Sequence, residues 1–231
     1  MGLKMSRMPY LQWPVFDGQR SEKAVSRSRL KKLIAVAAES GAFQELFPLF
    51  ADAREKAKRF LYICFLNEAG IERHADCRAA GAMPDRTKGF SKRFYDMNCL
   101  IDTVKSLQPD FLATACPAYP FDLVDKVQAA LECTGTSFLA VFVPCPTGCM
   151  YAPAMSLQSG KLAVETGLFP LYRIEQGMIR QTVTIQPLRP LADYLKIQPA
   201  LAGTTADDMH LVQEAVSEIA HYLEQPQQEL R

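Results

Sequence analysis

The residues best suited to chemistry follow four apolar runs of the chain. They are ESG at 39–41 after LIAVAA, NEA at 67–69 after LYICFL, TACPAYP at 114–120 after DFLA, and CPTGC at 145–149 after FLAVFVP. In open parallel sheets, ligands bind beyond the carboxyl ends of the strands. If the apolar runs are parallel strands, these four short segments therefore meet at one edge and form the candidate site.

Cysteines offer a second kind of chemistry. Cys145 and Cys149 form a Cys-x-x-x-Cys pair, and Cys77 lies in a long polar segment where an iron or zinc site could recruit it. Two nearby cysteines are more often unligated than half of a metal site, so both interpretations stay open. The remaining cysteines occur in apolar or helical contexts and are expected to be small core residues: Cys64, Cys99, Cys116 and Cys133.

Two strand-helix-strand units must position these residues. The first joins LIAVAA, a helical pattern over 43–58 and the apolar run at 59–66, and the second joins PDFLATAC, FDLVDKVQAALE and SFLAVFVP. Continuous apolar strands that alternate with amphipathic helices predict an α/β fold with a doubly wound, mostly parallel sheet. Between the units, residues 70–98 are polar and charged, which is typical of a long functional or mobile loop.

The remaining segments give a predicted domain division. Residues 1–32 are interpreted as an extended arm and a basic helix, 33–200 as the main domain, and 201–231 as a C-terminal amphipathic helix with Asp207 and Asp208 at its positive end. Within the main domain, a helix closed by Gly167 precedes a hairpin that turns at Gln176 and Gly177.

Composition excludes several classes of protein. The 231 residues carry 26 Lys and Arg against 25 Asp and Glu, so the net charge of +1 implies no nucleic-acid partner. No apolar run approaches the length of a membrane span, and the N-terminus lacks the apolar core of a secretory signal. Seven cysteines, an odd number, do not form a disulfide framework. We therefore expect a cytoplasmic globular protein.

Four segments carry a resemblance to a known family. LYICFLNEAG, ATACPAYPFDLVDKV, VPCPTG and GKLAVETGLFPLYRIEQG resemble, in order and spacing, the motifs of beta subunits of pyruvate:ferredoxin and other 2-oxoacid:ferredoxin oxidoreductases. The resemblance covers roughly residues 33–198. It implies the thiamine-diphosphate-binding fold, thiamine diphosphate with Mg²⁺, an iron-sulfur cluster, and the oxidative decarboxylation of a 2-oxoacid to acyl-CoA with electron transfer to ferredoxin.

The resemblance also implies the metal ligands. The family's Gly-Asp-Gly matches residues 38–40 and its Asp-Asn-Glu-Ala matches residues 66–69, so Glu39 and Asn67 fall where side chains ligate Mg²⁺. Glu39 carries one methylene more than Asp, which octahedral Mg²⁺ tolerates poorly, and Ser40 adds a side chain where the diphosphate approaches a glycine. Gly41 and Ala69 complete the two cofactor-binding segments.

A third segment of the implied cofactor site also departs from the family. Its Met-Asn-Thr-Gly is replaced by residues 71–74, in which Glu72 would repel the diphosphate while Arg73 and His74 could partly offset that charge.

A single residue of this sequence matches a ligand of the implied iron-sulfur cluster. Cys145 matches the family's fourth cluster ligand, and the sequence contains no cysteine before Cys64. A cubane cluster takes four protein ligands. Either other chains supply the rest, or the cluster and the N-terminal part that binds it are absent from this chain.

Two functions from different classes follow. The first is a subunit of a 2-oxoacid:ferredoxin oxidoreductase that works with alpha-, gamma- and delta-type subunits, with ferredoxin as a candidate partner, and is inactive in isolation. The second is a non-catalytic structural or regulatory subunit that keeps the fold without binding thiamine diphosphate or a cluster. Fold alone does not separate the two.

Overall fold

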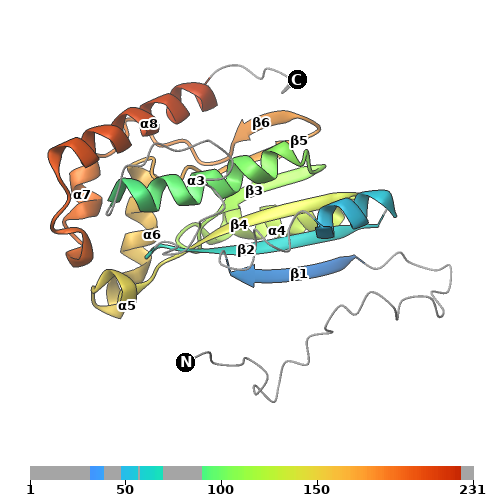
Figure 1. The fold of residues 1–231 in the computed structure, drawn as a ribbon, viewed down its shortest axis with the longest axis horizontal. Coiled ribbons are helices and arrows are strands. Elements are labelled where there is room, and N and C mark those ends of the chain that lie inside the picture. The colour runs from blue at the N-terminus through green and yellow to red at the C-terminus, as the bar shows by residue number, and fades with distance from the viewer. Residues whose placement is uncertain (1–31, 39–47, 57, 70–89, 225–231) are drawn as a thin grey trace, which may run out of the picture. The chain divides into compact units, whose positions relative to one another are not determined.

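The sheet confirms the predicted architecture. The computed structural model describes residues 32–38, 48–56, 58–69 and 90–224, and these belong to one compact unit (Figure 1). Six strands follow the order β1-β2-β4-β3-β5-β6. The first four in this order are parallel, and the last two pairings are antiparallel. The strands are β1 (Leu33–Ala38), β2 (Phe60–Asn67), β3 (Phe111–Ala115), β4 (Thr136–Val143), β5 (Tyr172–Glu175) and β6 (Met178–Gln181).

Helices lie on both faces of the sheet. The described residues form α3 (Phe90–Ser106), α4 (Pro120–Glu132), α5 (Pro146–Cys149), α6 (Ser156–Glu165), α7 (Leu191–Leu195) and α8 (Ala206–Glu224), with short 3-10 turns η1 (Pro153–Met155) and η2 (Pro199–Leu201). Residues 48–55 are also helical. None of these described helices is long and apolar enough to cross a bilayer.

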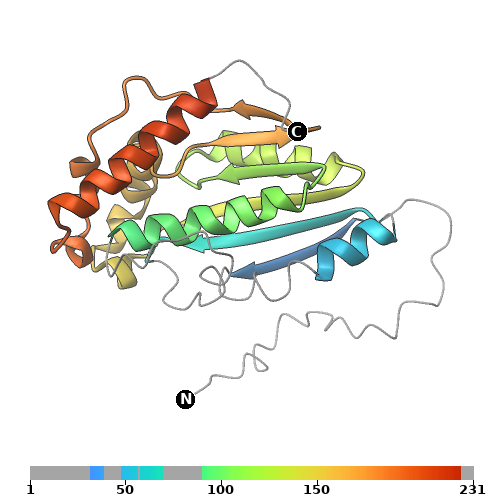
Figure 2. The same cartoon turned by 45° about the horizontal axis from the view of Figure 1, so that its top comes forward.

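Two hydrophobic cores lie between the sheet and the helices on its two faces. The larger one joins the helical stretch at 48–55 with α3, α6 and α8 on one face, and Figure 2 shows α3 and α8 in the same layer. Its centre is aromatic, since Tyr62 stacks on Phe138 with ring centroids 5.8 Å apart. The smaller core lies on the other face of the sheet, under α4. There Ala130 packs with apolar side chains of β2, β3 and β4. Strands buried on both faces explain why β3 and β4 read as continuous apolar runs.

The prediction of a loop over 70–98 is wrong for its last nine residues, because α3 begins at Phe90. Phe90, Phe94, Ile101 and Val104 recur at helical spacing and are buried. The charged residues between them concealed this period in the sequence. Residues 70–89 lie outside the described part of the chain.

Local predictions near the C-terminus are confirmed. Gln176 and Gly177 both have positive φ (51° and 77°), as a two-residue hairpin turn requires, and Gly167 closes α6 with φ of 76°. Asp208 in the first turn of α8 accepts a hydrogen bond from the Ser91 hydroxyl at 2.7 Å. This bond joins the N-termini of α3 and α8.

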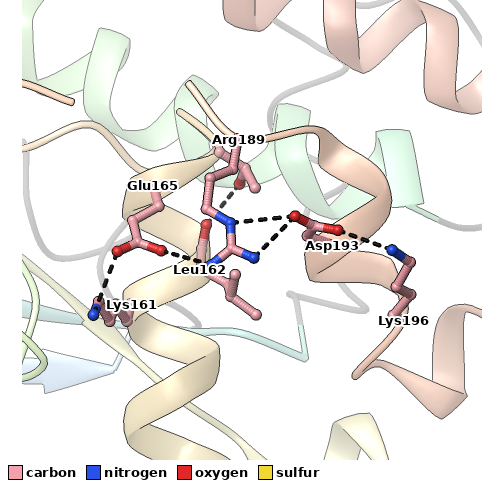
Figure 3. A network of polar contacts seen from close by, with 7 residues as sticks. Lys161, Leu162, Glu165, Arg189, Asp193 and Lys196 are labelled. Atoms are coloured by element: carbon pink, nitrogen blue, oxygen red, sulfur yellow. Dashed lines mark hydrogen bonds and ion pairs between the residues drawn. The ribbon is translucent and has the colours of Figure 1, made fainter. Parts of the chain in front are cut away.

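A surface charge network holds α6 and α7 together (Figure 3). The Arg189 guanidinium contacts Glu165 of α6 at 3.2 Å and Asp193 of α7 at 3.0 Å, and Lys196 contacts Asp193. Hydrogen bonds from Lys196 and Arg189 lower the pKa of Asp193. The backbone N–H of Arg189 also donates to the Glu165 carbonyl, so the network fixes the chain that leads from β6 to α7.

A buried lysine fixes the start of α4. The Lys126 ammonium donates to the Thr114 carbonyl at 2.7 Å and to Asp122 at 2.6 Å, and the residue is 1% exposed. Desolvation lowers its pKa to about 8, although the hydrogen bond to Asp122 opposes the shift. Lys126 thereby links α4 to the carboxyl end of β3.

We predict that Lys126→Met removes a pH dependence of stability. Between the folded pKa near 8 and the ordinary value of 10.5, the unfolded chain holds a proton that the folded chain has lost, so the free energy of unfolding rises with pH. The rise is at most about 3 kcal/mol. Urea unfolding from pH 7.5 to 10.5 should show a flatter profile for Lys126→Met, whereas Lys161→Met, at an exposed position, should follow the wild type. Identical profiles for all three proteins would contradict this role.

Candidate functional site

The structure brings three of the four strand-end segments to one edge, because the segment at 114–120 follows β3, the parallel neighbour of β4, and its Ala118 lies with Pro144 beside Gly160 of α6. Asn67 ends β2 opposite Val143 of the adjacent strand β4, and Cys145 follows two residues later. The Glu68 N–H continues the pairing by donating to the Val143 carbonyl at 2.9 Å. Asn67, Ala69 and Cys145 therefore lie at one edge of the sheet. The remaining predicted cofactor-binding residues lie outside the described part of the chain: Glu39, Ser40, Gly41, Glu72, Arg73 and His74.

The residue that organises this edge, Glu68, was missed as a site residue in the sequence. Its side chain is buried, and hydrogen-bond donors converge on both carboxylate oxygens. Oε2 accepts the Cys145 N–H at 2.8 Å and the Tyr151 hydroxyl. Oε1 accepts the Tyr194 hydroxyl at 2.9 Å, the Gln198 amide at 2.6 Å and the Ser159 hydroxyl. An acidic residue directly after a buried strand was the available signal, because a buried carboxylate requires donors.

The donors to Glu68 come from separate segments. Tyr151 follows α5, Ser159 lies on α6, Tyr194 on α7, and Gln198 precedes η2. Burial, followed by the charge of Glu68, raises the pKa of Tyr194 well above its ordinary value, and burial with the hydrogen bond to Glu68 raises that of Tyr151. Both phenols therefore remain donors at neutral pH, and Glu68 ties the chain after β4 to the end of β2.

Asn67 lies at the exposed carboxyl end of β2. Its Oδ1 accepts the N–H of Ala69 at 2.9 Å, which forms a local turn at the strand end, and the side chain is exposed. An amide oxygen is one of the oxygen ligands that Mg²⁺ takes in proteins. The Mg²⁺-ligand role of Asn67 stays a prediction.

The two cysteines near the edge differ in environment. The Cys145 sulfur is partly exposed and accepts the Gly148 N–H at 3.4 Å, at the start of α5. The Cys149 sulfur is buried, lies 3.7 Å from Arg93 Nη1, and has its pKa raised to about 12 by burial and the charge of Glu68. Cys149 therefore behaves as a core thiol. Across the described residues, no three or more His, Cys, Asp or Glu side chains cluster as metal ligands.

A small cavity lies behind the edge. It measures about 30 Å³ and is lined by residues that include Asn67, Glu68, Arg93, Phe142 and Tyr194. This volume suits a water molecule rather than a cofactor. A cofactor at this edge would therefore lie outside the cavity, on the exposed side of Asn67.

Comparisons with known proteins give close relatives of one kind. No family model matches the chain. It is 33% identical over 211 residues to pyruvate synthase subunit PorB of Methanocaldococcus jannaschii, covering 85% of this chain and 70% of the relative. The PorB subunit of Methanothermobacter thermautotrophicus is 30% identical, covering 92% and 73%. Ketoisovalerate oxidoreductase subunit VorB of Pyrococcus furiosus is 32% identical, covering 71% and 55%.

Close packing between the two strand ends gives a second testable prediction. A Cβ at Gly148 would lie 2.4 Å from the Ala69 Cβ and 3.1 Å from the Cys145 sulfur. Gly148→Ala should therefore lower the free energy of unfolding by about 1–3 kcal/mol, the usual cost of overpacking. In the double variant Ala69→Gly/Gly148→Ala the clash with residue 69 is gone, so urea unfolding should recover most of the loss.

The matched control is Gly203→Ala, because no described residue other than its two chain neighbours lies within 4 Å of a Cβ at that position. It should change stability by less than about 0.5 kcal/mol. A double variant as unstable as Gly148→Ala alone would show that residues 69 and 148 do not pack together.

Proposed function

Because the chain belongs to the beta-subunit family of 2-oxoacid:ferredoxin oxidoreductases, we propose that it works in such a complex as the subunit that binds thiamine diphosphate and Mg²⁺. The observation that carries the proposal is the exposed Asn67 oxygen at the carboxyl end of β2, held beside Cys145 by Glu68. The proposed reaction is the oxidative decarboxylation of a 2-oxoacid to acyl-CoA, with ferredoxin as the electron acceptor.

The chain's own residues would position the cofactor. Asn67 Oδ1 would ligate Mg²⁺ together with Glu39, and the segments at 39–41, 67–69 and 72–74 would hold the diphosphate. Bound thiamine diphosphate supplies the electron sink that cleavage beside a keto group requires. Cys145 would serve as one cluster ligand if other chains provide the remaining thiolates.

A non-catalytic subunit is the second candidate, and a specific observation favours it. Asn67 Oδ1 already accepts the Ala69 N–H, so the strand end needs no cation to be satisfied. The Glu68 network likewise forms entirely among the described side chains. In this alternative the edge keeps its shape for assembly alone, and Glu39, Ser40 and Glu72 mark a site that has lost its ligand.

A thermal-shift titration separates the two functions. Thiamine diphosphate with Mg²⁺ is added to the purified chain and to its complex with co-expressed partner subunits. Binding at about 100 times Kd stabilises the native state by about 2.7 kcal/mol, which should raise Tm by roughly 5–10 °C. The variant Asn67→Ala should lose most of this shift.

The matched control for that titration is Asn98→Ala on α3, which replaces an asparagine whose amide donates to the Phe94 carbonyl at 2.8 Å. It should respond to the cofactor as the wild type does. Absence of stabilisation in both the isolated chain and the complex would reject cofactor binding and leave the non-catalytic subunit.

A further inference from the structure

Helix α4 carries apolar residues on the side that faces away from the sheet. Phe121 is 86% exposed, Val124 51% and Leu131 38%, and the intervening Gln128 is also exposed. The positions 121, 124, 128 and 131 follow the 3-4-3 spacing that places side chains in one stripe along a helix. We refer to these four residues as the α4 stripe.

Among the described residues, the α4 stripe belongs to neither hydrophobic core. The opposite side of the helix is already packed, since Leu123, Val127 and Ala130 contact the smaller core and Lys126 is buried. A helix that presents a second apolar stripe to solvent is unusual, because one such stripe is enough to hold a helix on a sheet. Aligned exposed apolar residues mark a surface for association.

The exposed charges that α4 itself carries beside the stripe are acidic, and Arg59, which precedes β2, donates to the Leu131 and Glu132 carbonyls at the end of the helix. Asp125 and Glu132 are exposed next to it, whereas the helix's one basic residue, Lys126, is buried against Asp122. Two copies of α4 packed against each other would place these carboxylates together, which is unfavourable. A helix with Lys or Arg beside its apolar residues would instead complement them.

Both ends of α4 are held in place. Towards the N-terminal end, Lys126 in the middle of the helix donates to the Thr114 carbonyl and to Asp122 of the first turn. At the C-terminal end, Lys32 donates to the Cys133 carbonyl at 2.8 Å and Arg59 to the Leu131 carbonyl at 3.1 Å. These cations also satisfy carbonyls at the negative end of the helix. The stripe is therefore a preformed surface, which lowers the ordering cost of binding.

We propose that the α4 stripe docks an amphipathic helix, flanked by basic residues, from a different subunit of the complex. The inference rests on the proposed function, which makes this chain one subunit among several. Phe121 lies in the first turn of α4, and the preceding Ala118 packs toward Gly160 of α6 and Pro144, which adjoins Cys145. The docked subunit therefore reaches the carboxyl edge of the sheet, alongside the candidate site.

The test is assembly of the co-expressed complex with Phe121→Ser/Val124→Ser in this chain. Both side chains are exposed, so the Tm of the isolated variant should match the wild type. Pull-down and binding titration should show at least a tenfold weaker affinity for the docking subunit. Asp125→Lys/Glu132→Lys should weaken binding by a similar factor, most strongly at low salt.

The matched control is Met178→Ser, an exposed apolar residue on β6, which should assemble as the wild type does. Assembly of the α4 variants with unchanged affinity would overturn the proposal. So would dimerisation of the isolated chain that Phe121→Ser/Val124→Ser abolishes, because the partner would then be a second copy. Thermal shift by thiamine diphosphate in the wild-type complex reports separately on the proposed function, so failure of docking and failure of cofactor binding are distinguishable.

Discussion

The carboxylate of Glu68 lies where β2 leaves the sheet, and donors from four later segments of the chain meet on its two oxygens. An ionised carboxylate can only accept hydrogen bonds, and every donor here is a backbone N–H, an amide or a hydroxyl. Burying such a group without partners costs several kcal/mol, so the segments must be present and in place together. The turn after β4, α6, α7 and the chain before η2 are thus fixed by one interaction. Asn67 and Cys145, on either side of it, take their positions from the same arrangement.

This constraint relates the fold to the proposed function. The carboxyl edge of a parallel sheet is where ligands bind, but loops there need rigid support to place a cofactor within hydrogen-bonding distance. Glu68 supplies that support through its buried carboxylate, while Asn67 lies exposed at the end of β2. The same support would serve a subunit whose role is assembly, because α4 and the chain near Cys145 meet at this edge. The relatives show the family of the chain, whereas binding of the cofactor would distinguish a catalytic subunit from an assembly subunit.

Much of the fold could be predicted because the information is local. Apolar runs identified the central strands, and Gln176 with Gly177 identified the hairpin through their backbone preference. The start of α3 was missed because charged residues interrupt the apolar spacing in the first turns of the helix. Glu68 was missed for another reason, since Tyr194 and Gln198 lie more than 120 positions away in the sequence. No pattern near residue 68 in the sequence indicates those partners.

The most direct test of this account is native-state hydrogen exchange at the Cys145 amide, whose N–H donates to Glu68 Oε2. The comparison is between the wild type and Glu68→Gln, which keeps the shape of the side chain but turns one acceptor into a donor that faces other donors. Exchange at Cys145 should become at least tenfold faster in the variant, while the amide of Leu139 in the middle of β4 loses less protection. Equal protection of the Cys145 amide in both proteins would show that Glu68 does not hold this edge together.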